Sequence, residues 1–114
     1  MENTRLETTG VKHIKDTKRK GDFAEYYAVT WLWDKGYEVF QNSGCSGLID
    51  MIAVDKDGTI ILIDVKTAKQ DKRRKNKYVN VSGGSRTEEQ KKLGVKFLSF
   101  NPDTRQLSWV KHKT

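Results

Sequence analysis

The chain has 114 residues, of which 22 are Lys or Arg and 15 are Asp or Glu, so its formal charge at pH 7 is +7. This length favours one domain, and the single cysteine excludes an internal disulfide, in agreement with a reducing cytosol. No apolar run approaches the roughly 18 residues that a membrane span requires. A small domain this basic is typical of proteins that bind a polyanion, either nucleic acid or, less commonly, an anionic membrane surface.

The N-terminal segment 1–16 is polar and has no clear apolar period. It also lacks the apolar core of a secretory signal. We therefore expect a flexible polar arm over residues 1–16, followed by a single domain over residues 17–114, in a cytoplasmic protein.

The first strongly periodic segment predicts a helix from about Asp22 to Lys35, with Asp22 as its cap and Gly36 as its terminating glycine. Four residues recur at helical spacing and predict one buried stripe: Glu25, Ala28, Val29 and Leu32. Glu25 thus brings a carboxylate to the start of a buried face, where it needs a partner. Alternatively, Glu25 is a partly exposed residue that the helix macrodipole favours.

A β-hairpin is predicted by two apolar runs, 48–54 and 60–66, that flank a turn at Lys56-Asp57-Gly58. A three-residue loop that ends in a left-handed glycine suits Gly58. The resulting register pairs Val54 with Ile60, Ile52 with Leu62, and Asp50 with Asp64. The continuous apolar character predicts that both strands are central and covered on both faces.

The remaining elements complete an α/β pattern. A short strand is expected over 37–41, and strands over 95–100 and 106–110 are expected to be joined by a turn at Asn101-Pro102-Asp103. Thr87-Glu88-Glu89-Gln90 fits a capping box and predicts a short helix that Gly94 closes. This order of elements predicts a central mixed sheet of about five strands flanked by helices.

Two carboxylates and an amine gather on one face of the predicted hairpin, because side chains alternate along a strand. Asp50 and Asp64 face each other and repel unless a cation lies between them, and Lys66 shares the face of Asp64. Carboxylate oxygens are the ligands that Mg²⁺ prefers, and Lys66 can orient or deprotonate a water that attacks phosphate. The alternative is a hairpin end that becomes polar as it leaves the core and forms a surface ion pair.

Taken in order, these residues resemble the PD-(D/E)xK nuclease pattern: Lys20-Gly21-x-x-x-Glu25, then Ser46-Gly47-x-x-Asp50, then Asp64-x-Lys66. Within that superfamily the chain is most similar to the archaeal-type Holliday junction resolvases, including viral relatives. The resemblance spans residues 19–69 and has two departures. Ile49 stands in place of the proline of the motif, and position 64 is Asp where many relatives have Glu.

The resemblance implies a restriction-endonuclease-like core and a Mg²⁺-dependent DNA endonuclease in which Mn²⁺ substitutes for Mg²⁺. It implies that Glu25, Asp50 and Asp64 are metal ligands, that Lys66 activates water, and that Ser46 assists near the scissile phosphate. It further implies a homodimer that cuts four-way junctions, in the host-cell cytoplasm if the chain is viral. Two alternatives stay open: a related nuclease for nicked, flapped or duplex DNA, and a non-catalytic nucleic-acid-binding protein.

Phosphate contacts come mainly from Lys and Arg, so two basic segments are expected to bind DNA. Their residues are Lys18, Arg19, Lys20, Lys69, Lys72, Arg73, Arg74, Lys75 and Lys77. Aromatic residues are not interleaved with them as stacking platforms, which favours recognition of DNA shape over sequence.

Gln90 is either an active-site helper or only a helix cap. No histidine is placed to activate Cys45, so we expect neither a cysteine nucleophile nor a zinc site.

Overall fold

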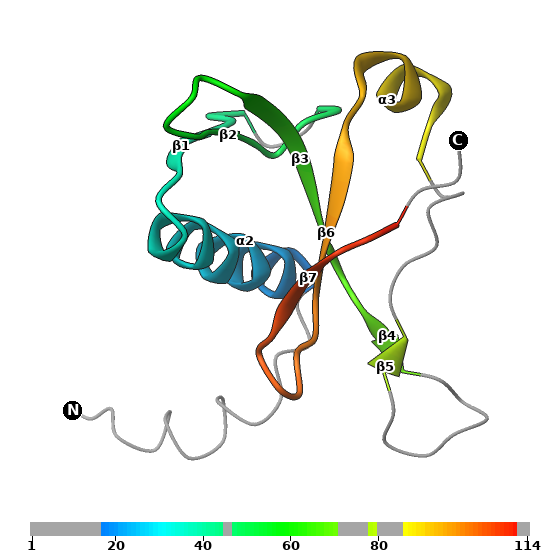
Figure 1. Cartoon of the computed structure of the whole chain (residues 1–114). Coiled ribbons are helices and arrows are strands. Elements are labelled where there is room, and N and C mark those ends of the chain that lie inside the picture. The colour runs from blue at the N-terminus through cyan, green and yellow to red at the C-terminus, as the bar shows by residue number, and fades with distance from the viewer. Residues whose placement is uncertain (1–16, 45–46, 71–77, 80–85, 112–114) are drawn as a thin grey trace.

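The computed structural model describes residues 17–44, 47–70, 78–79 and 86–111. Its central feature is a five-stranded mixed sheet in the order β1-β2-β3-β6-β7 (Figure 1). β3 and β6 are parallel, and the other neighbours in this sheet are antiparallel. The predicted α/β class, with a mixed sheet of about five strands, is therefore confirmed, whereas the predicted arm over residues 1–16 lies outside the described part.

The elements have the following bounds. The sheet consists of β1 (Glu38–Gln41), β2 (Met51–Val54), β3 (Ile60–Thr67), β6 (Lys96–Phe100) and β7 (Leu107–Trp109). The helices are α2 (Thr17–Asp34) and α3 (Glu88–Leu93). A second, two-stranded sheet, which the sequence analysis did not predict, joins β4 (Lys69–Gln70) to β5 (Tyr78–Val79). Neither described helix combines the length and apolarity that crossing a membrane requires.

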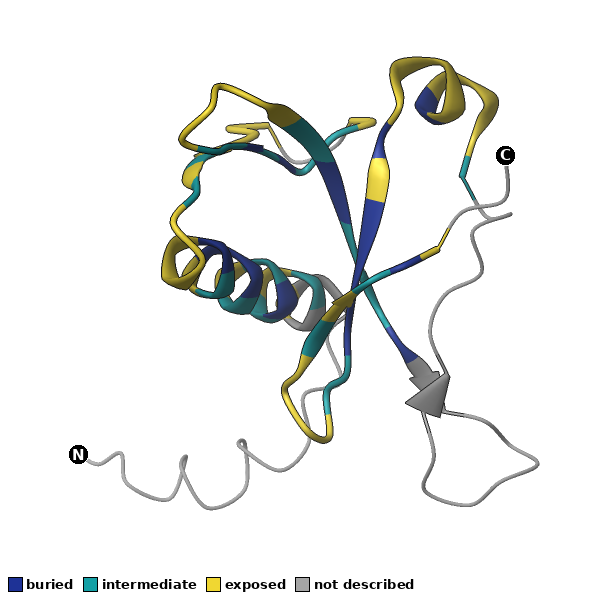
Figure 2. Cartoon of the chain, viewed as in Figure 1, coloured by how far each residue is buried: buried dark blue, intermediate teal, exposed yellow. Residues whose placement is uncertain are grey.

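The long helix α2 packs against one face of the sheet, and Figure 2 shows its buried residues on the side that faces the strands. Three residues of the predicted stripe are buried there: Ala28, Val29 and Leu32. They join Met51, Ala53, Ile63 and Leu98 in one apolar cluster. Glu25 is half-buried. The periodic pattern therefore identified the correct face of the helix, as expected for a surface helix with one apolar stripe.

The start of α2 corrects the predicted cap. The helix begins at Thr17, so Asp22 lies within it and does not cap it. Lys and Arg are good helix formers, and the basic residues before Gly21 extend the helix although an internal glycine costs about 1 kcal/mol. The end of the helix is as predicted, since Gly36 follows it and donates its N–H to the Trp33 carbonyl at 2.9 Å.

The hairpin of β2 and β3 has the predicted register. Val54 pairs with Ile60 and Ile52 with Leu62, while the ladder ends at the pair formed by Met51 and Ile63, so the predicted pair of Asp50 with Asp64 is not part of it. The loop of three residues is also confirmed. Gly58 has φ +85 and donates its N–H to the Asp55 carbonyl at 3.0 Å. A left-handed glycine at this position is what a three-residue hairpin loop requires.

The sheet face opposite α2 is only partly covered over β1, β2 and β3, which corrects the prediction of burial on both faces. Cross-strand pairing places Phe40, Ile52 and Leu62 on this face, beside Val54 and Ile60. Phe40 is 52% exposed and Ile60 is 62% exposed. Neither described helix packs over this region, and a continuous apolar run cannot by itself distinguish a covered face from an exposed one. The strand with four consecutive buried residues is β6.

The short helix α3 is built as its capping box predicts. Thr87 is the N-cap, its side chain accepts from the Gln90 N–H, and the Gln90 side chain accepts from the Thr87 N–H. Gly94 ends the helix in a left-handed conformation. Because Gln90 occupies the third helical position, its side chain is anchored at the helix start and is buried. This places an amide at the edge of the carboxylate pair described below.

Candidate active site

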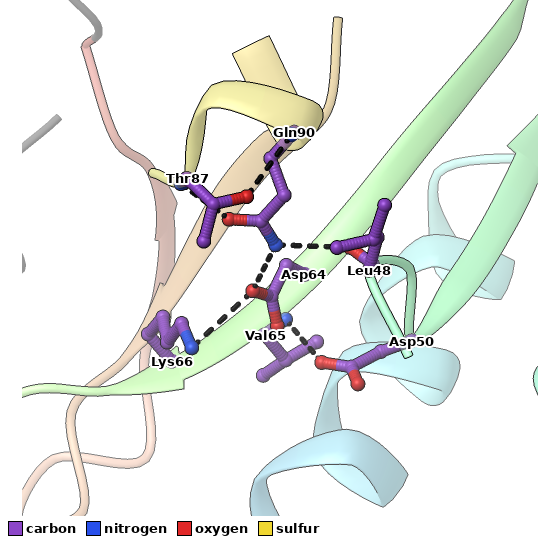
Figure 3. A network of polar contacts seen from close by, with 7 residues as sticks. All are labelled: Leu48, Asp50, Asp64, Val65, Lys66, Thr87 and Gln90. Atoms are coloured by element: carbon purple, nitrogen blue, oxygen red, sulfur yellow. Dashed lines mark hydrogen bonds and ion pairs between the residues drawn. The ribbon is translucent and has the colours of Figure 1, made fainter. Parts of the chain in front are cut away.

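Side chains from three parts of the fold meet beside β3 (Figure 3). Asp50 lies just before β2, Asp64 and Lys66 lie on β3, and Gln90 lies on α3. The Val65 N–H donates to Asp50 Oδ2 at 2.7 Å, and Lys66 Nζ lies 3.3 Å from Asp64 Oδ2. The structure thus brings together three of the residues that the sequence marks, Asp50, Asp64 and Lys66, while their catalytic roles remain predictions.

The backbone explains why Asp50 and Asp64 are adjacent. The Asp50 N–H donates to the Ile63 carbonyl at 2.8 Å, which holds Asp50 beside β3 but one residue out of the register in which Ile63 pairs with Met51. Asn42 holds the same segment from the other side, since its N–H donates to the Asp50 carbonyl and its side-chain amide donates to the Ile49 carbonyl. Asn42 was missed by sequence reasoning, because an Asn in a polar loop has no local signal that identifies its partner.

The environment of the pair opposes ionisation of Asp50. Burial and a hydrogen bond with the Asp64 carboxyl group are the main causes that raise the pKa of Asp50 to about 7, and the hydrogen bond from the Val65 N–H opposes this rise. The negative charges of Asp64 and Glu25 act in the same direction as burial. At neutral pH and without a cation, Asp50 is therefore protonated in a substantial fraction of molecules.

The negative charge of Glu25 affects the pair formed by Asp50 and Asp64, since it raises the pKa of Asp50. Burial raises the pKa of Glu25, and the charges of Asp22 and Asp64 add to this rise. Within the described residues, however, no three His, Cys, Asp or Glu side chains are gathered so that they could hold a metal ion together. Ligation of one ion by Glu25, Asp50 and Asp64 therefore stays a prediction.

The chemistry of the close pair still fits a divalent cation. Asp50 and Asp64 offer carboxylate oxygens, which are the ligands that Mg²⁺ prefers. Protonation of Asp50 removes the repulsion between the two negative charges, and a cation bound between the carboxylates would also remove it. The pair is therefore suited to bind a divalent cation.

Lys66 is held at the site but still reaches solvent. Its amine contacts Asp64 Oδ2 and lies 5.3 Å from the centroid of the Phe97 ring, within cation–π range. Its side chain is 42% exposed. An amine in this position can meet a water or a phosphate that approaches the carboxylates from solvent.

The other residues that the sequence predicts to act in catalysis or DNA binding are undescribed or described only in part. Ser46 and Cys45 lie outside the described residues, as do five of the predicted DNA-binding residues: Lys72, Arg73, Arg74, Lys75 and Lys77. Lys18 and Lys20 belong to α2 and Lys69 to β4, but only their backbone is described. Arg19 is exposed on α2. The contribution of these residues to DNA binding stays a prediction.

The fold thus combines a five-stranded mixed sheet, packed on one face by α2, with a carboxylate pair and an amine beside β3. No protein-family model matches the chain, and no curated protein matches it. Among solved structures, the chain is similar to the bacterial homing endonuclease I-Ssp6803I, with a TM-score of 0.62 and 19% sequence identity. The match covers 82% of this chain and 64% of that chain, so this chain spans less than two thirds of its solved neighbour. At this identity the likeness shows a shared fold.

Proposed function

We propose that the protein is a metal-dependent endodeoxyribonuclease of the PD-(D/E)xK type, which hydrolyses phosphodiester bonds by direct attack of water. The observation that carries the proposal is the contact of two acids with each other and of an amine with one of them: Asp50, Asp64 and Lys66. A fold that a homing endonuclease shares and a formal charge of +7 support DNA as the substrate.

The residues have distinct roles in this proposal. Asp50 and Asp64, with Glu25, hold Mg²⁺, for which Mn²⁺ substitutes. A divalent ion supplies a more acidic water and stabilises negative charge on the phosphate. Lys66 orients the attacking water or accepts its proton at Nζ. Ser46 assists near the scissile phosphate.

We further propose that the preferred substrate is a four-way DNA junction and that the acting species is a homodimer. The resemblance to archaeal-type resolvases supports the substrate. One chain offers one such acid pair among its described residues, so two symmetric cuts require two copies, and two-fold assembly is the commonest oligomeric form. The exposed apolar residues Phe40 and Ile60 provide surface that a second copy can cover.

A related endonuclease acting on nicked, flapped or duplex DNA is the second candidate. The observation that favours it is the solved neighbour itself, which is named a homing endonuclease and not a resolvase. A non-catalytic nucleic-acid-binding protein is the third candidate, and the contact of Lys66 with Asp64 argues against it, since DNA binding alone does not require this arrangement.

Cleavage of a labelled four-way junction, compared with a linear duplex of matched sequence, tests the proposal. With Mg²⁺ we expect paired nicks at symmetric positions of the junction, slower cutting of the duplex, and no cutting in EDTA. Paired nicks within one binding event would support the dimer. Equal cutting of both substrates would favour the second candidate. Binding without cleavage in either Mg²⁺ or Mn²⁺ would contradict the nuclease proposal.

Removing positive charge from segment 69–77 is expected to weaken DNA binding and to leave the chemical step unchanged. Replacing Arg73, Arg74 and Lys75 together by Gln removes three phosphate contacts in this proposal. Affinity should then fall about 100-fold near 0.15 M salt, and the slope of log K against log salt should become shallower by about 2.7. Fluorescence anisotropy over a salt series measures both quantities.

The matched control neutralises three exposed lysines outside both basic segments: Lys56, Lys96 and Lys111. It removes the same charge, so it corrects for the general effect of net charge. An equal loss of affinity in this control would show that the segment has no special role. Normal binding with lost cleavage in the first variant would contradict the division of roles.

A further inference from the structure

The side-chain amide of Gln90 makes three hydrogen bonds that define its orientation (Figure 3). Its Oε1 accepts from the Thr87 N–H at 3.1 Å, and its Nε2 donates to the Leu48 carbonyl at 2.9 Å and to Asp64 Oδ2 at 2.8 Å. A backbone N–H can only donate and a carbonyl can only accept, so exchanging the amide oxygen and nitrogen would break the first two bonds. The amide N–H group therefore points at Asp64.

This contact restricts the carboxylate of Asp64. Gln90 Nε2 and Lys66 Nζ both contact the same oxygen, Oδ2, while Oδ1 is free of these two contacts. Gln90 is 5% exposed and Asp64 is 8% exposed. Rotation of the carboxylate would leave a buried amide N–H without its acceptor, which is unfavourable. Gln90 thus orients the carboxylate of Asp64, so that one oxygen faces the amide and the other is turned away from it.

The same amide also holds the segment that carries the other acid. Leu48, whose carbonyl accepts from Gln90, lies two residues before Asp50. The Thr87 N–H anchors the Gln90 amide in turn, because Gln90 Oε1 accepts from it, and this bond does not involve the Thr87 side chain. One amide therefore connects α3, the loop before β2, and β3. No local feature of the sequence indicates that these three segments meet.

We propose that Gln90 is a positioning residue, whose amide sets the orientation of Asp64 and its spacing from Asp50 before a divalent cation binds. The inference rests on the proposed function, because it assigns Asp64 to metal binding. Gln90 itself contacts neither metal nor substrate in this proposal. It acts through Asp64, and its loss should weaken metal binding more than its capping role alone can explain.

The test measures Mn²⁺ affinity of the full chain by titration calorimetry, without DNA. Gln90→Met keeps a similar volume but removes both the donor and the acceptor. Losses of outer hydrogen-bonding partners typically weaken metal binding about 10- to 100-fold, and we expect that range here. The control Thr87→Ala removes the hydroxyl half of the capping box without touching Asp64, and its Mn²⁺ affinity should stay within about threefold of the wild type.

A stability measurement separates positioning from general destabilisation. Thermal unfolding without metal shows how far each variant destabilises the fold, and the loss of Mn²⁺ affinity in Gln90→Met should persist well below its melting temperature, where the variant is folded. Equal weakening by Gln90→Met and Thr87→Ala would overturn the inference. A wild type that binds no metal overturns the proposed function together with this inference, whereas normal metal binding by Gln90→Met overturns the inference alone.

A measurement on the wild type keeps the inference testable if Gln90→Met does not fold. In a Mg²⁺ titration followed by ¹H–¹⁵N NMR, the side-chain amide resonances of Gln90 should shift with the midpoint of metal binding, because the group donates to a metal ligand. The side-chain amides of Gln41 and Gln106, which are exposed, should stay in place. Unchanged Gln90 resonances at saturating Mg²⁺ would contradict the positioning role.

Discussion

Replacing Asp50 by Asn is expected to stabilise the metal-free protein at neutral pH and, at the same time, to abolish cleavage. Burial and the neighbouring Asp64 raise the pKa of Asp50 to about 7, so its ionised form is unfavourable. Asn keeps an acceptor for the Val65 N–H and can donate to Asp64 without carrying charge. Allowing for the solvent that still reaches this group, we expect the free energy of unfolding to rise by about 1–2 kcal/mol.

The pH dependence of this effect has a definite sign. The pKa of Asp50 is about 7 in the folded chain against an ordinary value of 3.8, so between these values the folded state binds more protons than the unfolded state. The stabilisation is fully present below pH 3.8 and is lost as the pH rises through 7. Burial also raises the pKa of Glu25, which acts in the same direction. The stability advantage of Asp50→Asn should therefore grow from pH 4 to 7 and then level off.

Thermal unfolding in EDTA at several pH values measures this difference, and a shift of roughly 5 °C is expected at pH 7.5. The control Asp57→Asn makes the same chemical change at an exposed residue of the hairpin turn. Mg²⁺ should raise the melting temperature of the wild type and not that of Asp50→Asn, because ligand binding to the folded state stabilises it. A variant less stable than the wild type in EDTA at pH 7.5 would contradict the electrostatic account of this pair.

Replacing Lys66 by Ala is expected to lower the turnover number about 10²- to 10⁴-fold, which is the usual contribution of a positioned proton acceptor or donor. The amine lies 3.3 Å from Asp64 Oδ2 and is 42% exposed, so it is placed to meet an attacking water. Junction affinity should change little, because one phosphate contact at most is lost. Single-turnover cleavage and anisotropy measure the two quantities separately.

Lys56→Ala is the matched control for Lys66, since Lys56 is an exposed lysine in the turn at the opposite end of the same hairpin. It removes the same charge without touching the carboxylates, and its turnover should stay close to that of the wild type. The role of Lys66 in the chemical step would be excluded if Lys66→Ala lost affinity but cut bound DNA at the normal rate.

Local patterns were sufficient to predict the parts of the fold whose geometry depends on neighbouring residues. The register of β2 with β3 follows from the loop length and from Gly58, because the turn aligns the two strands that it joins. The capping box of Thr87 and Gln90 likewise involves atoms three residues apart. The buried side of α2 followed from the helical period of Ala28, Val29 and Leu32.

Other features depended on packing and were predicted incorrectly or left open. Asp22 has the chemistry of a cap, but the basic residues before it continue α2 back to Thr17. The apolar character of β2 and β3 predicted burial on both faces, yet Ile60 remains 62% exposed. Whether a face is covered depends on which elements pack over it, and a single strand does not contain that information.

The sequence by itself determined the α/β class, the hairpin, and the placement of Asp50 at the start of one hairpin strand and of Asp64 and Lys66 on the other, because alternation and turn geometry relate residues that are close along the chain. The tertiary structure alone decided that Gln90, which follows Asp64 by 26 positions, donates to its carboxylate, and that burial raises the pKa of Asp50 to about 7. Desolvation and hydrogen bonds between distant segments depend on where whole elements pack, and they exist only once the chain has folded.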